Sequence, residues 1–323
     1  MQFPFQLARD REFDCVGFGT NAVDYLIEVP EYPVFNSKVE LNKYTQAAGG
    51  EVATTMVGLQ RLGMKTAYVG RFGDDPAGSF GLKSLSDEGV NIDHAEQVAG
   101  ASTQIAFIVI DARNGERTVI WKRDAKLAYA EANAPIDLVD RASVLHLTPH
   151  DVKAATAMAR AAREAGALVS IDVDNIFEGI EDLLPLVDVF IASAEFPARL
   201  LGITDHREAL PEMMRRYGCK IAGVTLGAAG SLLYCDGEFI KTPGYDVPGG
   251  CKDTTGAGDA YRVGMIYGAM MGSSIEEAAK FANGVAALKC RSLGARTSLP
   301  NRSELSDFIS SNIKTDLSHR STM

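Results

Sequence analysis

The stretch "CKDTTGAGDAYRVGMIYGAMMG" (251–272) places three small residues and one carboxylate at the start of an apolar segment. Gly256, Ala257 and Gly258 lie between two threonines and Asp259, and the residues that follow are typical of a buried helix. Small side chains let a ligand approach the backbone, and free N–H groups at a helix N-terminus form an anion site suited to phosphate. Asp259 would repel phosphate, but it could serve as general base for a hydroxyl that attacks a phosphoryl group. These residues alone leave open the alternative that Asp259 only stabilises the first helical turn.

The composition is that of a soluble globular protein with a large core, since 46% of the 323 residues are hydrophobic and 23% are charged. A formal net charge of -10 and a pI of about 5.1 argue against a nucleic-acid or anionic-membrane surface. The five cysteines are scattered and lack CxxC spacing, which indicates free thiols in a reducing compartment. No stretch has the length of a membrane span or the apolar centre of a signal peptide. We therefore expect a cytoplasmic protein.

Apolar, β-branched runs alternate with helical patterns along most of the chain. Short strands are predicted at 14–19, 65–73, 143–149, 167–174, 188–194 and 220–227. Helices are predicted at 50–63, 76–89, 151–166, 206–218, 256–271, 274–290 and 302–313. This alternation predicts an α/β fold in which a doubly wound, mostly parallel sheet is sandwiched by helices.

Two regions break the alternation. Residues 22–50 and 103–124 have the pattern of strands without intervening helices, and "DARNGER" (111–117) in the second carries an Asn-Gly hairpin signal. A small sheet attached to a large α/β body suggests a lid, which we assign to about 22–48 and 103–124. No repeat or low-complexity linker divides the chain, so we expect a single domain over residues 1–323.

The segment "DTTGAGDAY" (253–261) resembles the signature of the ribokinase-like (PfkB) carbohydrate kinases, which phosphorylate sugars and nucleosides with ATP. Further matches to this family occur in the expected order along nearly the whole chain. They are "GFGTNAVDYLIEVP", "AGGEVATTMVGLQRLG", "VGRFGDDPAGSFGLKSLSDEGVN", "VTLGAAGSLLY" and "FANGVAALKCRSLGARTSLP". The resemblance implies the ribokinase-like fold with a β-sheet lid.

The resemblance also implies a catalytic role for the opening stretch. Asp259 would deprotonate the acceptor hydroxyl, and the charge on the transferred phosphoryl group would be held by the amides of Gly256, Ala257 and Gly258. Mg²⁺ is expected on the ATP phosphates, where it neutralises charge and orients the γ-phosphoryl group.

Other positions are implied for binding. The sugar would contact Asp24, Gly49 and Gly50. ATP would be bound by Thr225, Gly227, Thr255, Gly256, Gly258 and Asn283, with Asn283 near the adenine. A monovalent cation, K⁺, would be held by Asp253 and Thr255 with groups around Ser292, Gly294 and Ser298.

The sequence departs from the family pattern on the substrate side. Thr54 stands where many members have Asn, and Glu51 stands where ribokinases have Lys. A cation replaced by an anion argues against ribose bound in the ribokinase way and against a phosphorylated sugar at that place. The Asn-x-x-Glu element that helps organise Mg²⁺ in ribokinases is "ASAE" here, with Ala192 in the Asn place and Glu195 kept as an indirect Mg²⁺ candidate.

The C-terminal segment "FANGVAALKCRSLGARTSLPNRSEL" is similar to ketose-type kinases, including the sulfofructose kinase branch. Arg262, one turn after Asp259, would contact a polar or anionic group of the acceptor, or would only pair with a nearby acid. Lys122 and Arg123 are further candidates for an anionic substituent, with the same alternative. Asp172 and Asp174 at a strand end would touch ligand or Mg²⁺, or would cap the next segment.

These observations predict an ATP-dependent kinase that acts on a hydroxyl of a small sugar, a ketose or related carbohydrate. The alternatives are an adenosine-type nucleoside kinase on the same fold and a catalytically silent sugar- or nucleotide-binding regulator. A homodimer through the lid strands is expected, because these strands would otherwise expose an edge. The sequence does not identify the sugar or the hydroxyl.

Overall fold

A large, mostly parallel sheet forms the body of the protein. In the computed structural model, which describes the backbone of residues 1–320 and the side chains of residues 1–312, this sheet has nine strands. Their spatial order is β13 (Glu238–Thr242), β12 (Ser231–Cys235), β11 (Ile221–Thr225), β10 (Val189–Ser193), β9 (Leu168–Val173), β8 (Ala142–Leu147), β1 (Phe13–Phe18), β4 (Thr66–Gly73) and β5 (Ala95–Val98). Neighbouring strands from β11 to β5 are parallel. The predicted fold class is confirmed.

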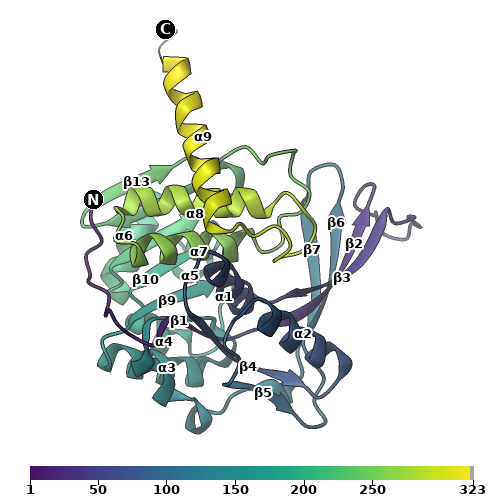
Figure 1. Cartoon of the computed structure of the whole chain (residues 1–323), viewed down its shortest axis with the longest axis horizontal. Coiled ribbons are helices and arrows are strands. Elements are labelled where there is room, and N and C mark those ends of the chain that lie inside the picture. The colour runs from purple at the N-terminus through teal and green to yellow at the C-terminus, as the bar shows by residue number, and fades with distance from the viewer. Residues whose placement is uncertain (321–323) are drawn as a thin grey trace.

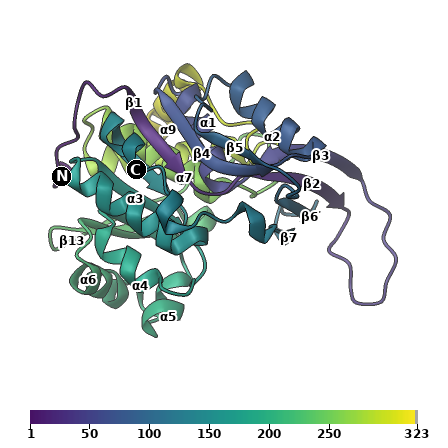
Figure 2. The same cartoon turned by 90° about the horizontal axis from the view of Figure 1, so that it is seen from below.

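Helices cover both faces of this sheet (Figures 1 and 2). One face packs against α1 (Glu51–Arg61), α2 (Pro76–Asp87), α7 (Ala257–Met270), α8 (Ile275–Lys289) and α9 (Arg302–Arg320). The other packs against α3 (Val152–Glu164), α4 (Ile180–Leu183), α5 (Phe196–Leu201) and α6 (His206–Tyr217). Cys15 belongs to the first core and Val16 to the second, as expected for a strand that is buried on both sides.

Several features differ from the sequence prediction. Strand β5 and helices α4 and α5 were not predicted, because four to six residues are too few to show a clear apolar periodicity. The antiparallel hairpin β12–β13 was not predicted, although its turn at Asp236-Gly237 has positive φ at both residues, which Asp-Gly favours. The last helix, predicted at 302–313, continues to Arg320 because neither Gly nor Pro interrupts it.

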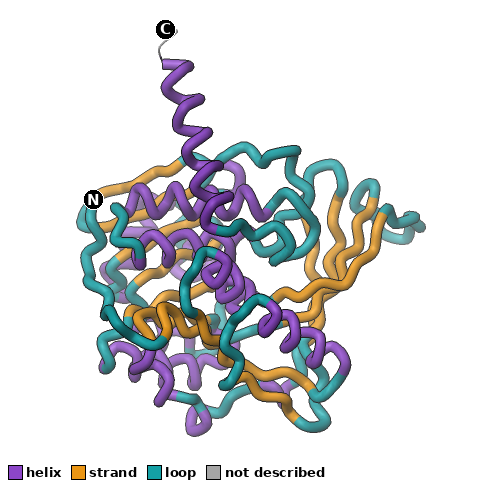
Figure 3. Tube along the Cα trace, viewed as in Figure 1, coloured by secondary structure: helices purple, strands orange, loops and turns teal. Residues whose placement is uncertain are grey.

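A second, smaller sheet projects from the body (Figures 1 and 3). Within the described part of the chain it has four strands, in the order β3 (Lys43–Gly49), β2 (Ala22–Val29), β6 (Ile105–Asp111) and β7 (Arg117–Lys122). The predicted hairpin is β6–β7, and Gly115 in its turn has φ 75°. Leu26, Ile108 and Ile110 form its small buried core. Among residues 1–320, no helix combines the length and the apolar character that a bilayer span requires.

Candidate active site

A cleft of about 930 Å³ lies between the body and the small sheet. The carboxyl ends of parallel strands supply its floor, which is the usual ligand edge of an open α/β sheet. From this edge come Thr20, Asp172, Ser193 and Thr225. The small sheet contributes Ala22, Asp24, Ala106, Ile108, Val119 and Trp121. The turn 254–259, which leads into α7, lines the same cleft as both sets of residues.

The turn before α7 needs a glycine at position 256. Gly256 is the N-cap residue with φ 78°, and a side chain there would meet Ala295, whose Cα lies 2.9 Å from the position of an added Cβ. Among the three predicted amides, that of Ala257 donates to the carbonyl of Thr254 at 3.1 Å. The amides of Gly256 and Gly258 donate to no acceptor in the described part of the chain. Two free amides at the mouth of a fourteen-residue helix form an anion site.

Asp259 lies in the first turn of α7, beside this anion site. Burial raises the pKa of its carboxyl group well above the ordinary value, and the nearby carboxylate of Asp172 raises it further. The Arg262 guanidinium opposes this rise in pKa. A carboxylate whose pKa is raised binds a proton more strongly than an ordinary aspartate does, which suits it to act as a general base.

Arg262 is held by the protein itself. Its side chain is buried, its Nη2 lies 2.8 Å from Asp172 Oδ1, and the same nitrogen donates to the carbonyl of Ile191 at 2.8 Å. Of the two interpretations left open by the sequence, the geometry favours pairing with a nearby acid. Asp172, which the sequence left between ligand contact and capping, connects Arg262 to Asp259.

A further acidic group, Glu51, faces the same part of the cleft. Its Oε2 accepts a hydrogen bond from Thr20 Oγ1 at 2.9 Å and lies 3.7 Å from His150 Nδ1. Burial raises the pKa of Glu51 well above its ordinary value, and Asp172, Asp174 and Asp259 add to the rise. This side of the cleft therefore offers several oxygen acceptors to the hydroxyl donors of a ligand.

Asp24 lies at the end of the cleft nearest the small sheet. Its side chain is 3% exposed, and burial raises its pKa to about 7, against the opposing charge of Arg296. A Cβ at Gly49 would overlap the Asp24 carboxylate, so the glycine is needed for Asp24 to lie where it does. Arg296, also buried, donates to the carbonyl of Gly49 and fixes this strand end.

The other end of the cleft carries the residues predicted for the nucleotide. Thr225, Gly227 and Asn283 line it, together with Tyr245 and Val247. The amide of Asn283 donates to Ser231 Oγ at 3.3 Å and to the carbonyl of Ala279 at 3.1 Å. Thr255 lies between the two ends, and its buried Oγ1 has no hydrogen-bond partner among the described residues. Such a group is suited to a ligand oxygen.

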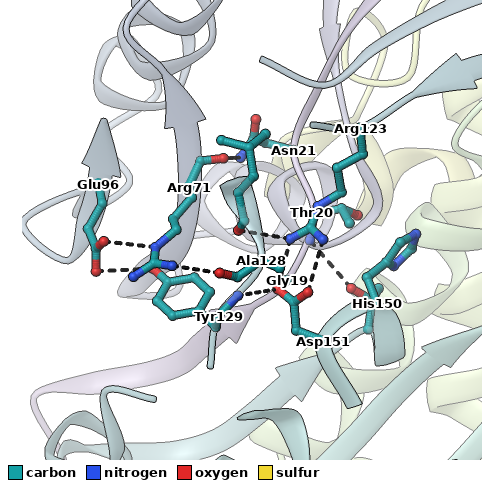
Figure 4. A network of polar contacts seen from close by, with 12 residues as sticks. Gly19, Thr20, Asn21, Arg71, Glu96, Arg123, Ala128, Tyr129, His150 and Asp151 are labelled. Carbon is teal, nitrogen blue, oxygen red and sulfur yellow. Dashed lines mark hydrogen bonds and ion pairs between the residues drawn. The ribbon is translucent and has the colours of Figure 1, made fainter. Parts of the chain in front are cut away.

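Four residues predicted to contact the sugar or Mg²⁺ do not line the cleft: Gly49, Thr54, Arg123 and Glu195. Arg123 forms an ion pair with Asp151 at 2.7 Å (Figure 4). It also donates to the carbonyl of Leu127. Thr54 is fully buried within α1, and Glu195 is exposed at the N-terminus of α5. The geometry gives none of them a ligand contact. Local sequence cannot reveal that a loop 28 residues away supplies the partner of Arg123.

The residues predicted for a monovalent cation gather beside the anion site. The Asp253 carboxylate accepts from the amides of Thr255 and Gly294, at 2.8 and 2.7 Å. However, Lys289 Nζ donates to the carbonyl of Asp253 at 2.7 Å. A buried ammonium group therefore lies directly beside Asp253, the carboxylate that the sequence predicts for K⁺. Burial lowers the pKa of Lys289, and Asp253 opposes this effect.

Sequence reasoning missed Lys289. It follows Ala282 and Val285 at helical spacing, so a helix over 274–290 places it on the apolar face. A lone lysine on an apolar face is the signal that could have revealed a buried charge.

Comparison with known proteins finds one matching family and several similar proteins, all of them kinases. The family described as "pfkB family carbohydrate kinase" matches residues 14–302. The rice fructokinase-1 (Oryza sativa subsp. japonica) is 32% identical over 321 residues, covering 90% of this chain and 95% of the relative. A nucleoside kinase of Methanothermobacter thermautotrophicus is 26% identical over 313 residues, covering 92% and 95%. A fructokinase double mutant of Vibrio cholerae O395, solved with fructose, ADP and potassium ion, has a TM-score of 0.76 at 26% identity, covering 93% and 100%.

Proposed function

The chain belongs to the pfkB family of carbohydrate kinases, and from this premise we propose that it transfers the γ-phosphoryl group of ATP to a hydroxyl of a small sugar. One observation carries the proposal. A carboxylate with a raised pKa, Asp259, stands next to two free amides at the point where the two ends of the cleft meet. An acceptor hydroxyl and a phosphoryl group are the partners that such a pair would serve.

In this reaction Asp259 takes the proton of the attacking hydroxyl, and the oxygen attacks the γ-phosphorus in line with the bond to the β-phosphate oxygen. The amides of Gly256 and Gly258 bind the charge on the phosphoryl oxygens, with the Thr255 hydroxyl beside them. We expect Mg²⁺ to travel with ATP and to neutralise the phosphate charge. Glu195 does not line the cleft, so we assign it no contact with the metal.

The end of the cleft that carries Asp24, here called the acceptor end, favours a neutral polyol. Asp24, Glu51 and Asp172 line this end, and Arg262, the cation nearest to Asp259, is already paired. Carboxylates accept hydrogen bonds from hydroxyl groups and repel a phosphate or sulfonate substituent. We therefore propose an unphosphorylated sugar of the ketose type, for which the rice fructokinase is a relative at 32% identity.

We propose that the small sheet acts as a lid. Its hairpin already contacts the loop before the anion site: the amide of Thr254 donates to the carbonyl of Gly115 at 3.1 Å, and Arg117 donates to Thr254 Oγ1 at 2.8 Å. Closure over the sugar would exclude water and limit hydrolysis of ATP. The exposed aromatic side chains of Tyr44 and Phe107, stacked around Tyr25, support pairing of two lids in a homodimer. The five free cysteines support a cytoplasmic location.

A nucleoside kinase is the second candidate, because an aromatic group lines the acceptor end. The rings of His150 and Phe177 are 4.9 Å apart, and those of Trp121 and His150 are 6.0 Å apart. All three residues line the cleft, where they could stack on a nucleobase. A relative of the chain is named a nucleoside kinase.

A panel of acceptors distinguishes these functions. Purified protein is incubated with MgATP and, separately, with fructose, other ketoses, ribose, fructose 6-phosphate or adenosine, and the product mass and ADP are measured. We expect one ketose to gain one phosphoryl group per ADP formed. Phosphorylation of adenosine and of no sugar would replace the proposal with the nucleoside kinase, and binding without any transfer would indicate a silent regulator.

A further inference from the structure

Lys289 ends α8 with a completely buried side chain. Its Nζ donates to the carbonyl oxygen of Asp253 at 2.7 Å and lies 3.8 Å from Asp253 Oδ2. The Asp253 side chain is also 0% exposed. A buried carboxylate requires a positive partner, and Lys289 is the cation in contact with this one.

The groups around this pair are those predicted to hold a monovalent cation. Asp253 Oδ1 accepts from the amide of Thr255 and Oδ2 from that of Gly294. Ser298 Oγ donates to the carbonyl of Lys289 at 2.5 Å. The ammonium group of Lys289 thus lies against the main chain and carboxylate of Asp253, the residue on which the predicted cation site depends.

The balance of charge at Asp253 argues against an additional cation beside the ammonium group. Asp253 and Lys289 together carry no net charge. A K⁺ ion among the same atoms would place a second positive charge beside the buried ammonium and would have to displace it from the Asp253 carbonyl.

We propose that the ε-ammonium group of Lys289 takes the place of a monovalent metal cation, so that the protein neither binds nor needs K⁺ at this position. The claim that Lys289 replaces a bound K⁺ ion does not depend on catalysis. The claim that turnover needs no K⁺ rests on the proposed kinase function.

The connection to the anion site runs through two short contacts. Asp253 holds the amide of Thr255, which immediately precedes Gly256. It also holds the amide of Gly294, whose neighbour Ala295 packs against Gly256. Lys289 therefore acts as a positioning residue: it does not line the cleft, and it supports the turn that carries the free amides.

The first experiment compares ions with the wild-type protein. Its Tm, and its turnover with MgATP and the sugar identified in the acceptor panel, are measured in KCl, NaCl and choline chloride at one ionic strength. We expect both quantities to be the same in all three salts, within about twofold for turnover. Turnover that rises tenfold or more with K⁺, or a K⁺-specific rise in Tm, would overturn the proposal.

The second experiment creates room for the ion with Lys289→Ser. Without K⁺ we expect a lower Tm and a ~10- to 100-fold loss of turnover, because the turn holding the phosphoryl amides is loosened. K⁺ should restore both in a saturable way, while Na⁺ and choline should not. A folded variant that keeps full turnover in choline chloride, or that K⁺ does not restore, would contradict the proposal.

Two further variants serve as controls. Lys289→Met fills the same space without charge, so it should show the loss without rescue by K⁺. Lys280→Ser removes an exposed lysine of the same helix and should behave as wild type. If Lys289→Ser does not fold, the wild-type salt series still decides the question. Since the Tm measurements need no substrate, a failure of the kinase assignment would be seen separately in the acceptor panel.

Discussion

Asp253 and Asp259 stand six residues apart on the two sides of one turn, and their surroundings are opposite. Asp253 is fully buried, yet two backbone amides and the Lys289 ammonium surround it. Asp259 faces the cleft, with Asp172 in contact and Glu51 nearby, and its pKa is raised. A charge that is fully compensated holds the backbone in place, whereas a charge that is poorly compensated is available for proton transfer. The free amides of Gly256 and Gly258 lie between the two.

The largest expected effect comes from removing the poorly compensated charge. Asp259→Asn removes the proposed base, and we expect turnover to fall ~10²–10⁴-fold. Tm should stay the same or rise, because a buried acid beside Asp172 is lost. Turnover with MgATP and sugar, measured together with Tm, checks both. A fall in Tm that matches the loss of turnover would mean that Asp259 is structural.

Removing the compensated charge of Asp253 should instead lower the stability of the protein. Asp253→Asn leaves the Lys289 ammonium group buried without a carboxylate, so we expect the free energy of unfolding to fall by about 3 kcal/mol. Urea denaturation measures this change, with Asp246→Asn as a control because the side chain of Asp246 is not buried. An unchanged unfolding midpoint would show that the pair contributes nothing to stability.

Asp24→Asn tests a third carboxylate, on the sugar side. The pKa of Asp24 is raised to about 7, so the folded protein favours the protonated carboxyl group. The stability that Asp24 provides is therefore complete below its ordinary pKa and is lost as pH rises through 7. We expect the variant to be more stable than wild type at pH 8, on the order of 2 kcal/mol, and the two to converge at pH 4. KM for the sugar should rise at least tenfold. Equal stability of the two proteins at pH 8, measured by urea denaturation, would contradict the burial argument.

The smallest effect on turnover at its pH maximum is expected from Arg262→Met. Its guanidinium lowers the pKa of Asp259 and pairs with Asp172, so its loss should raise the pKa of the base. The rise of turnover with pH should move upward by about one pH unit. The ranking of acceptor sugars should not change, because Arg262 is already paired. A changed ranking would restore the interpretation in which this residue recognises the sugar.

Much of the fold follows from local patterns in the sequence. The predicted parallel strands and long helices match the structure because their apolar periodicity is set within a few residues. The position of Asp259 at the start of a helix was equally visible from "GAGD". The hairpin β12–β13 had its own Asp-Gly turn signal, which was overlooked.

The partners of charged side chains could not be predicted from local sequence patterns. Arg123 follows a strand of the small sheet and pairs with Asp151 outside the cleft, whereas Arg262 lies inside α7 and pairs with Asp172 on the cleft floor. Lys289 meets Asp253 across 36 residues because α8 ends beside the loop that precedes α7. Such contacts depend on tertiary packing, which one sequence does not encode locally.

The pH dependence of turnover at saturating sugar and MgATP tests the role of Asp259 most directly, because titration of Asp24 should act mainly on sugar binding. The raised pKa of Asp259 means that its carboxylate form accumulates only as pH rises. We therefore predict that wild-type turnover increases with pH and then levels off, with a slope of about one below the pKa. The residual turnover of Asp259→Asn should be flat over the same range. A variant that keeps the wild-type rise with pH would contradict the assignment of Asp259 as the base.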